Sequence, residues 1–225
     1  MTNKTIKIAL DGPSGSGKST MAKLLAKDMG YVYIDTGALY RTIGLYVWRK
    51  GLASHDKEGI VALLPEISIT MRLVDGGGVV FLNGEQIGDE IRTPEISKYA
   101  SDVSKIPEVR DFLLELQRNI AGTNNVIMDG RDIGTVVLPD AQVKIFMVAN
   151  DETRARRRYK ELLEKGQDVK YEDVLADIRW RDKNDREREV APAVPAEDAI
   201  IHDNSGTSIQ ENLEELKKII IGNLS

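Results

Sequence analysis

The residues with the clearest chemistry lie together near the start of this 225-residue chain. They read Gly12-Pro13-Ser14-Gly15-Ser16-Gly17-Lys18-Ser19 and match the phosphate-binding pattern G-x-x-x-x-G-K-[ST] at every fixed position. Glycines let successive backbone amides turn inward around phosphate oxygens, and the helix that follows adds partial positive charge. Lys18 can reach the β- and γ-phosphates, and the hydroxyl of Ser19 can ligate Mg²⁺. The segment predicts a site for a nucleoside triphosphate, with a flexible glycine-rich turn as the alternative.

A phosphate-binding loop of this kind needs a strand before it and a helix behind it. The apolar run at 6–10 and the helical pattern at 17–29 meet that need. The alternation continues along the chain, which favours an α/β protein with a parallel sheet covered by helices on both faces. Further strands are expected at 31–35, 125–129, 143–149 and 199–203, and further helices at 37–50, 107–121, 151–165, 171–188 and 208–221.

One stretch, residues 63–105, departs from this alternation. Residues 67–73 alternate strictly between apolar and polar, as a half-exposed strand does. We interpret 63–105 as an inserted lobe with a small antiparallel sheet and a helix, beside a core domain made of 1–62 and 106–225. A surface insertion without function is the alternative. Within the insert we expect a second strand at 79–82, turns at 75–78 and at Asn83-Gly84, and a helix at 93–105.

Polar residues also follow the predicted strands, at the sheet edge where ligands bind in open α/β proteins. Asp129 ends an apolar strand and can hold Mg²⁺ through water, and Arg131 comes soon after it. Thr36 and Arg41 follow the strand at 31–35 and would suit a second anion, the phosphate of an acceptor. The alternatives are a surface loop for Arg131, and ordinary helix capping with a solvent-facing arginine for Thr36 and Arg41.

Arginine is concentrated late in the chain, within residues 151–188. Guanidinium groups bind phosphate through two parallel hydrogen bonds, so two such helices beside a phosphate-binding loop predict a lid over the transferred group. A solvated helix surface balanced by neighbouring glutamates is the alternative. The eight arginines are Arg154, Arg156, Arg157, Arg158, Arg179, Arg181, Arg186 and Arg188.

The bulk composition narrows the class of protein. A net charge of −5 argues against general nucleic-acid binding, and the lack of cysteine excludes disulfides and thiolate metal sites. No apolar stretch of the sequence approaches the ~20 residues of a membrane span. The residues before the first strand show no signal-peptide pattern. We therefore expect a cytoplasmic protein that binds small molecules and neither nucleic acid nor membrane.

Seven short motifs together carry a family resemblance. They are Asp11 to Ser19, Asp35 to Arg41, Ile91-Arg92-Thr93, Asp129 to Thr135, Arg181-Asp182, Asp185-Arg186 and Ala191-Pro192. On these motifs the whole chain, its insert included, resembles the bacterial cytidylate kinases, which are P-loop nucleoside-monophosphate kinases. The resemblance implies a five-stranded parallel sheet, a monophosphate-binding lobe and a short helical lid at about 151–188. It also implies the Mg²⁺-dependent reaction ATP + CMP ⇌ ADP + CDP, with dCMP as a further acceptor, in a protein that we expect to be a monomer.

The resemblance further implies roles for individual residues. The run from Asp11 to Thr20 would bind ATP, with Ser19 and Asp129 at the metal. Lys18, Arg131 and Arg157 would stabilise the charge that develops during transfer. The acceptor site would comprise Thr36 at the end of its strand, Arg41, Arg131 and Arg188 on the phosphate, Arg181 and Asp185 at the ribose, and Ser101, Arg110 and Asp132 around cytosine.

These base contacts suit cytosine, because a carboxylate or hydroxyl accepts from its exocyclic amine and an arginine donates to N3 and O2. Uracil would leave Arg110 facing a donor and Asp132 facing an acceptor. Two other functions stay open at this point. One is a P-loop kinase acting on another monophosphate or on a hydroxyl, and the other is a nucleotide-dependent switch without transfer activity.

Overall fold

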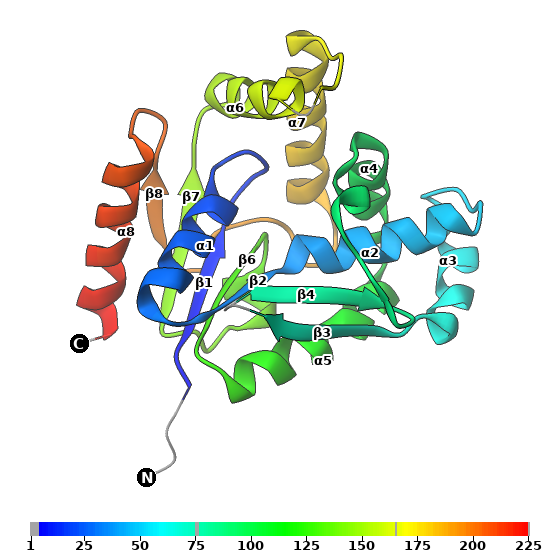
Figure 1. The fold of residues 1–225 in the computed structure, drawn as a ribbon, viewed down its shortest axis with the longest axis horizontal. Helices are drawn as coiled ribbons and strands as arrows, with labels where there is room; N and C mark the ends of the chain where they lie inside the picture. Colours follow the sequence, from blue (N-terminus) through cyan, green and yellow to red (C-terminus); the bar gives the residue numbers. More distant parts are fainter. Residues whose placement is uncertain (1–4, 75–76, 165, 225) are drawn as a thin grey trace.

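The computed structural model describes residues 5–74, 77–164 and 166–224. A single sheet runs through them in the order β3-β4-β2-β6-β1-β7-β8, with the short β5 paired to β4 (Figure 1). The strands are β1 (Lys7–Asp11), β2 (Val32–Asp35), β3 (Ile69–Val74), β4 (Gly77–Leu82), β5 (Glu85–Gln86), β6 (Val126–Gly130), β7 (Val143–Val148) and β8 (Ile200–Asp203).

The five strands β2, β6, β1, β7 and β8 are all parallel, which confirms the predicted α/β class. In the centre of the sheet, Ile8 of β1 pairs with Ile127 on one side and Val143 on the other. Side chains on both faces of β1 are fully buried, as parallel strands require when helices cover both sides. The carboxyl ends of these strands therefore meet at one edge of the sheet.

Helices cover the two faces of this parallel region (Figure 1). Met21 of α1 and Leu216 of α8 pack on one face, and Ala121 of α5 packs on the other. The helices are α1 (Lys18–Met29), α2 (Thr36–Arg49), α3 (Lys57–Leu63), α4 (Pro94–Val103), α5 (Pro107–Thr123), α6 (Asp151–Glu164), α7 (Tyr171–Glu187) and α8 (Ile209–Leu224). Three short turns are η1 (Leu64–Glu66), η2 (Asp89–Arg92) and η3 (Ile133–Val137).

The predicted antiparallel hairpin is present as β3 and β4. It continues the main sheet, because Gly77 at the start of β4 pairs in parallel with Tyr33 of β2. Of the turn expected at 75–78, residues 75–76 lie outside the described part of the chain, and β4 already begins at Gly77. Asn83 and Gly84 have positive φ angles of 49° and 85° and connect β4 to β5, as the Asn-Gly pair predicts.

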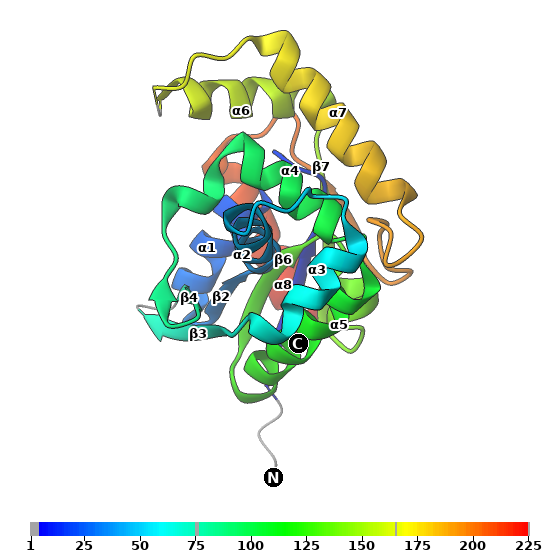
Figure 2. The same cartoon turned by 90° about the vertical axis from the view of Figure 1, so that its right-hand side faces the viewer.

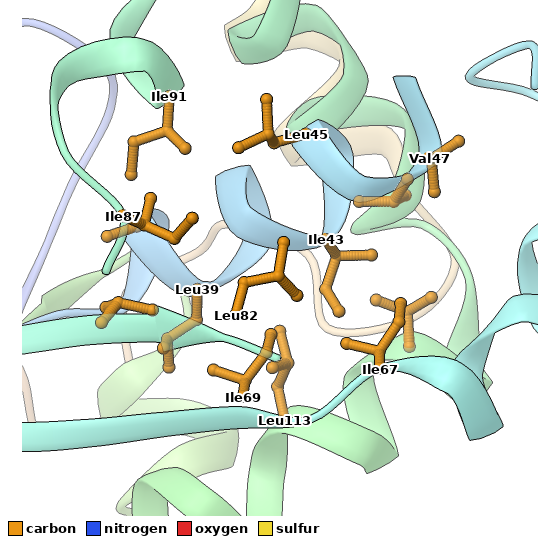
Figure 3. Close-up of a cluster of buried hydrophobic side chains, with 14 of the residues drawn as sticks. Leu39, Ile43, Leu45, Val47, Ile67, Ile69, Leu82, Ile87, Ile91 and Leu113 are labelled. Atoms are coloured by element: carbon orange, nitrogen blue, oxygen red, sulfur yellow. The ribbon is translucent and has the colours of Figure 1, made fainter. Parts of the chain in front are cut away.

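A hydrophobic cluster joins this hairpin to α2 (Figure 3). Leu39 and Ile43 of α2 lie over Ile69 and Leu82 of the hairpin, and Leu113 of α5 packs into the same cluster. The predicted helix of the insert is α4, which packs against α2. The division into a core and an inserted lobe stays a prediction. Helix α3 was not expected, and its start is fixed by Asp56, whose carboxylate accepts from the amide of Gly59.

Helices α6 and α7 pack on each other around a small core of their own, formed by Ala155, Leu162, Val174 and Ile178. They lie over the end of the molecule that carries α4 and the loop between β1 and α1 (Figure 2). A pair of helices with a separate core above that loop is what the predicted lid requires.

Candidate active site

A cavity of about 870 Å³ lies at the carboxyl ends of the parallel strands, beside α6 and α7. The glycine-rich loop and the start of α1 line one part of it. Helix α4, the start of α2 and the segment after β6 line another part, and side chains of α6 and α7 complete the wall. The fold therefore brings most of the predicted ATP residues and most of the predicted acceptor residues around a single space.

The loop from Gly12 to Ser19, here called the P-loop, needs its glycines for different reasons. A Cβ on Gly12 would lie 2.2 Å from the carbonyl oxygen of Met147, at a φ of +145°. Gly15 and Gly17 have φ angles of +74° and +85°, which side chains with a Cβ rarely adopt. These constraints hold the loop close to the end of β7 and to α6.

Lys18 is buried at the base of the P-loop, and its ammonium donates to the carbonyl oxygen of Pro13 at 3.0 Å. Burial, followed by the charge of Arg131, lowers the pKa of Lys18 to about 7. Burial removes the ammonium of Lys18 from solvent, and a second cation nearby makes its charge still less favourable. A triphosphate is the kind of ligand that would satisfy such a site.

Not every residue of the predicted ATP run lines the cavity. Ser14, Gly15 and the residues from Gly17 to Thr20 do, whereas Asp11, Gly12, Pro13 and Ser16 do not. The carboxylate of Asp11 accepts from the amides of Ile133 and Gly134. The side chain of Asp11 therefore faces the segment after β6, and its expected part in ATP binding stays a prediction.

Asn204, which follows β8, links the P-loop to the lid. Its side-chain amide donates to the carbonyl oxygen of Ser16 at 2.7 Å, and its own oxygens accept two bonds from Arg157. This contact holds Arg157 on the cavity wall above Gly17 and Lys18. Burial lowers the pKa of the Arg157 guanidinium.

Ser19 and Asp129, the two residues expected at the metal, are in direct contact. The Ser19 hydroxyl donates to one carboxylate oxygen at 2.6 Å, and the hydroxyl of Tyr33 donates to the other at 2.9 Å. Burial, followed by the nearby charge of Asp35, raises the pKa of Asp129. A divalent cation bound here would favour the charged form of Asp129 and so oppose this rise in its pKa. The pair suits a cation that is bound mainly by phosphate and water oxygens.

The start of α2 forms the next part of the wall. Asp35, and not Thr36, caps the helix, because its carboxylate accepts from the amide of Ala38. Thr36 instead donates to the carbonyl oxygen of Asp129. Arg41 pairs with Asp35 at 2.8 Å, and this contact lowers the pKa of Asp35 although burial opposes it.

Arg131 points from the end of β6 toward α7, where its Nε donates to Asp185 at 2.9 Å. Burial disfavours both charges, but each stabilises the other, so the pKa of Arg131 is raised and that of Asp185 is lowered. Arg181, one turn earlier on α7, is half-buried nearby, and its buried Nε has no hydrogen-bond partner in the described part of the chain. Burial and Arg131 lower its pKa.

Asp132 lies between two arginines from distant segments. One carboxylate oxygen contacts Arg110 of α5, and the other is 3.3 Å from Arg188, which follows α7. Arg110 stands behind Asp132 and does not itself line the cavity, whereas Asp132 and Arg188 do. Arg110 also lies over the ring of Tyr40, 5.5 Å from its centroid. Burial raises the pKa of Tyr40 to about 12.

Ser101 completes this end of the cavity. It lies on α4, its Oγ is buried, and among the described residues that oxygen has no hydrogen-bond partner. Ser104, one turn later, donates to the carbonyl oxygen of Ser101 and accepts from Arg188. A buried hydroxyl that faces a cavity without a protein partner is available to a ligand.

The arginines of this segment have different surroundings. Arg157, Arg158, Arg181 and Arg188 line the cavity. Arg179 forms surface ion pairs with Asp151 and Glu152, so the alternative of a solvated helix surface holds for it. Arg154 is buried against the P-loop. It donates to the carbonyl oxygens of Ser14 and Ala149 and pairs with Asp151 and Asp182.

Comparison with known proteins connects this geometry to a family. The cytidylate kinase family model matches residues 8–221 of the chain. A cytidylate kinase of Caldicellulosiruptor bescii is 52% identical over 216 residues, which cover 96% of each chain. The chain belongs to the cytidylate kinase family. Another family member, from Thermosipho melanesiensis, is 52% identical over 214 residues, 95% of this chain and 96% of that one.

Solved structures agree on the fold. An uncharacterized protein from Eubacterium ventriosum superposes with a TM-score of 0.53 at 13% identity, covering 96% of this chain and 99% of the other. At that identity the likeness concerns the fold alone. Kinases of this family use ATP.

The cavity is also lined by residues that were not expected at the site from the sequence, among them Tyr40, Ser104 and Asn204. Tyr40 lies one residue before Arg41 in a motif that was recognised, so its position on the helix was the available signal. Ser104 follows Ser101 by one helical turn. Asn204 had no signal, because its contacts are with Ser16 and Arg157, far away in the sequence.

Proposed function

We propose that this chain transfers the γ-phosphoryl group of ATP to the phosphate of CMP, and also to that of dCMP. One observation carries the proposal. A single cavity has the P-loop and Lys18 on its wall together with the unpartnered hydroxyl of Ser101 and the carboxylate of Asp132, and Arg131 lies on the same wall. A donor and an acceptor nucleotide can thus share one water-poor space.

Selection of cytosine would use the far end of the cavity. Asp132 is held by Arg110 and Arg188, so it presents an acceptor of fixed orientation to an exocyclic amine. Ser101 supplies a second acceptor. Uracil has a carbonyl oxygen in place of that amine and would leave these acceptors unpaired, which disfavours its binding.

The transfer step needs no general base, because the attacking oxygen of the CMP phosphate is already ionised. A bond forms between that oxygen and the γ-phosphorus, while the bond to the β–γ bridging oxygen breaks and its electrons leave with ADP. Lys18, Arg131 and Arg157 would hold the negative charge that is spread over the transferred group.

Mg²⁺ would be held by Ser19 directly and by Asp129 through water. The contact of 2.6 Å between their oxygens supports this fit, because hard oxygen ligands are the ones Mg²⁺ prefers. When bound, the ion would neutralise charge on the β- and γ-phosphates.

Further parts of the proposal concern the molecule as a whole. We infer that the protein acts as a monomer in the cytoplasm, where neither nucleic acid nor membrane takes part. No helix in the described ranges is long and apolar enough to cross a bilayer. We also retain residues 63–105 as the monophosphate-binding lobe, because α4 carries Ser101.

A coupled assay of ADP formation tests the function, with CMP, dCMP, UMP, AMP, GMP and shikimate as acceptors. We expect turnover with CMP and dCMP that requires Mg²⁺ and is much slower with UMP. Faster turnover with another acceptor would reassign the substrate. Tight retention of ADP without stimulation by any acceptor would indicate a nucleotide-dependent switch.

A further inference from the structure

Asp11 ends β1 and comes directly before the P-loop, yet it does not line the cavity. Its two carboxylate oxygens accept from the backbone amides of Ile133 and Gly134, at 2.9 and 2.8 Å. Only 6% of Asp11 is exposed. Hydrogen bonds between a carboxylate and amides are among the strong ones, and burial makes each of them matter more.

The backbone of Asp11 is tied to the same segment. Asp11 pairs with Gly130 at the end of the ladder between β1 and β6. Its side chain holds Ile133 and Gly134, which begin η3. One residue therefore fixes both ends of the segment 130–134.

The segment held in this way carries two of the acceptor-site residues. Arg131 and Asp132 lie between the two attachment points. Asp132 reaches Arg110 and Arg188, so its place depends on the backbone that precedes Ile133. Among the described residues Asp11 forms no hydrogen bond or ion pair with these side chains. Apart from the repulsion between its charge and that of Asp132, it acts on them through the backbone.

The segment has little room to find another arrangement. A Cβ on Gly130 would lie 2.6 Å from the side chain of Ile133 and 2.7 Å from the hydroxyl of Thr36. A Cβ on Gly134 would lie 3.1 Å from the side chain of Lys144. The amides of Ile133 and Gly134 would therefore not replace a lost bond to Asp11 by shifting slightly toward another acceptor.

We propose that Asp11 is a positioning residue for base selection: through the amides of Ile133 and Gly134 it holds Asp132 between Arg110 and Arg188. This inference rests on the proposed function, because it takes Asp132 as a contact of cytosine. It differs from the sequence-based expectation, in which Asp11 belongs to the ATP site.

The Asp11→Asn substitution tests the proposal with almost no change in volume. The side-chain carbonyl oxygen of the asparagine can accept from one of the two backbone amides. Its NH₂ group faces the other backbone amide, and two donors that face each other repel. We expect the segment to tilt and Asp132 to move. The kcat/KM for CMP should fall about tenfold, and the ratio of kcat/KM for CMP over UMP should fall with it. The KM for ATP should stay within about twofold, because the P-loop keeps its other contacts.

Two control variants separate this effect from a general one. Asp28→Asn makes the same chemical change in a partly exposed ion pair with Lys217, outside the cavity wall, and should leave the ratio unchanged. Leu216→Ala lowers stability in the core between α1 and α8 and should lower the melting temperature without moving the ratio. If Asp11→Asn does not fold, Asp11→Glu provides the test. It keeps the charge but displaces the two amides by one methylene, and the same fall in the ratio is expected.

Three results would overturn the proposal or its basis, and they can be told apart. A raised KM for ATP with an unchanged ratio would return Asp11 to the ATP site. A lower melting temperature with an unchanged ratio would make Asp11 a residue of the fold only. A wild-type protein without turnover of CMP would refute the proposed function itself, before any variant is considered.

Discussion

Ser101 lies in the last turn of α4 and Ser104 directly follows the helix, and both line the cavity. They differ in one respect that can be measured. The Ser101 hydroxyl has no partner among the described residues, whereas the Ser104 hydroxyl bonds the carbonyl oxygen of Ser101 at 2.9 Å and Arg188 at 3.3 Å. Substitution of each by alanine should therefore separate binding of a ligand from stability of the fold.

Ser101→Ala should leave the free energy of unfolding unchanged or slightly raised, because a buried polar group without a partner is lost. Bound CMP would lose one acceptor for its exocyclic amine. An unpaired buried group of that kind costs about 1–2 kcal/mol, which corresponds to roughly a 5- to 30-fold lower kcat/KM for CMP. UMP should lose less, so the preference for CMP should narrow.

Ser104→Ala is the matched control, since it removes two hydrogen bonds within the protein. It should lower the melting temperature by about 2–6 °C, at roughly 2–4 °C for each kcal/mol in a chain of this size. The measurements are thermal unfolding of the free protein and steady-state kinetics with CMP and UMP. A melting temperature that falls equally in both variants, or kinetics with CMP that Ser101→Ala leaves unchanged, would refute the reasoning.

Three further outcomes are expected. Lys18→Ala should lower kcat by at least about a hundredfold without loss of stability, because burial already disfavours the Lys18 charge; normal turnover in the folded variant would contradict the assignment. Arg131→Ala should lower kcat/KM for CMP at least about tenfold, whereas unchanged kinetics with a lower melting temperature would leave Arg131 a structural role toward Asp185. Burial raises the pKa of Asp11 to about 7 although the amides of Gly134 and Ile133 favour its charged form, so the free energy of unfolding should fall as the pH rises from about 4 toward 7. Chemical denaturation of the free protein across pH 4–8 should show this slope, and Asp11→Asn should flatten it.

The P-loop and its setting could be predicted from the sequence by itself. Its glycines, Lys18 and Ser19 are contiguous, and the strand and helix around them follow from local periodicity. The same is true of where each strand of the parallel sheet lies along the chain and of the turn at Asn83 and Gly84, because each depends on residues within a few positions of one another.

The roles of the arginines were decided by the tertiary structure. Arg154, Arg157 and Arg179 come from one arginine-rich region and look alike in the sequence. In the fold, Arg154 is buried against the P-loop, Arg157 is held on the cavity wall by Asn204, and Arg179 lies at the surface. The side-chain directions on a helix are regular, but what each direction meets depends on segments up to 140 positions away.

Asp11 shows the same limit at the end of a strand. Its position before the P-loop predicts an ATP contact, because proximity in the sequence is the available signal. Its carboxylate instead bonds Ile133 and Gly134, 122 and 123 positions along the chain. The pairing of β1 with β6 brings those amides beside it, and that pairing exists only once the sheet has formed. The sequence therefore determined which chemical groups are present at the site, and the tertiary structure decided which of them face the ligands and which hold the others in place.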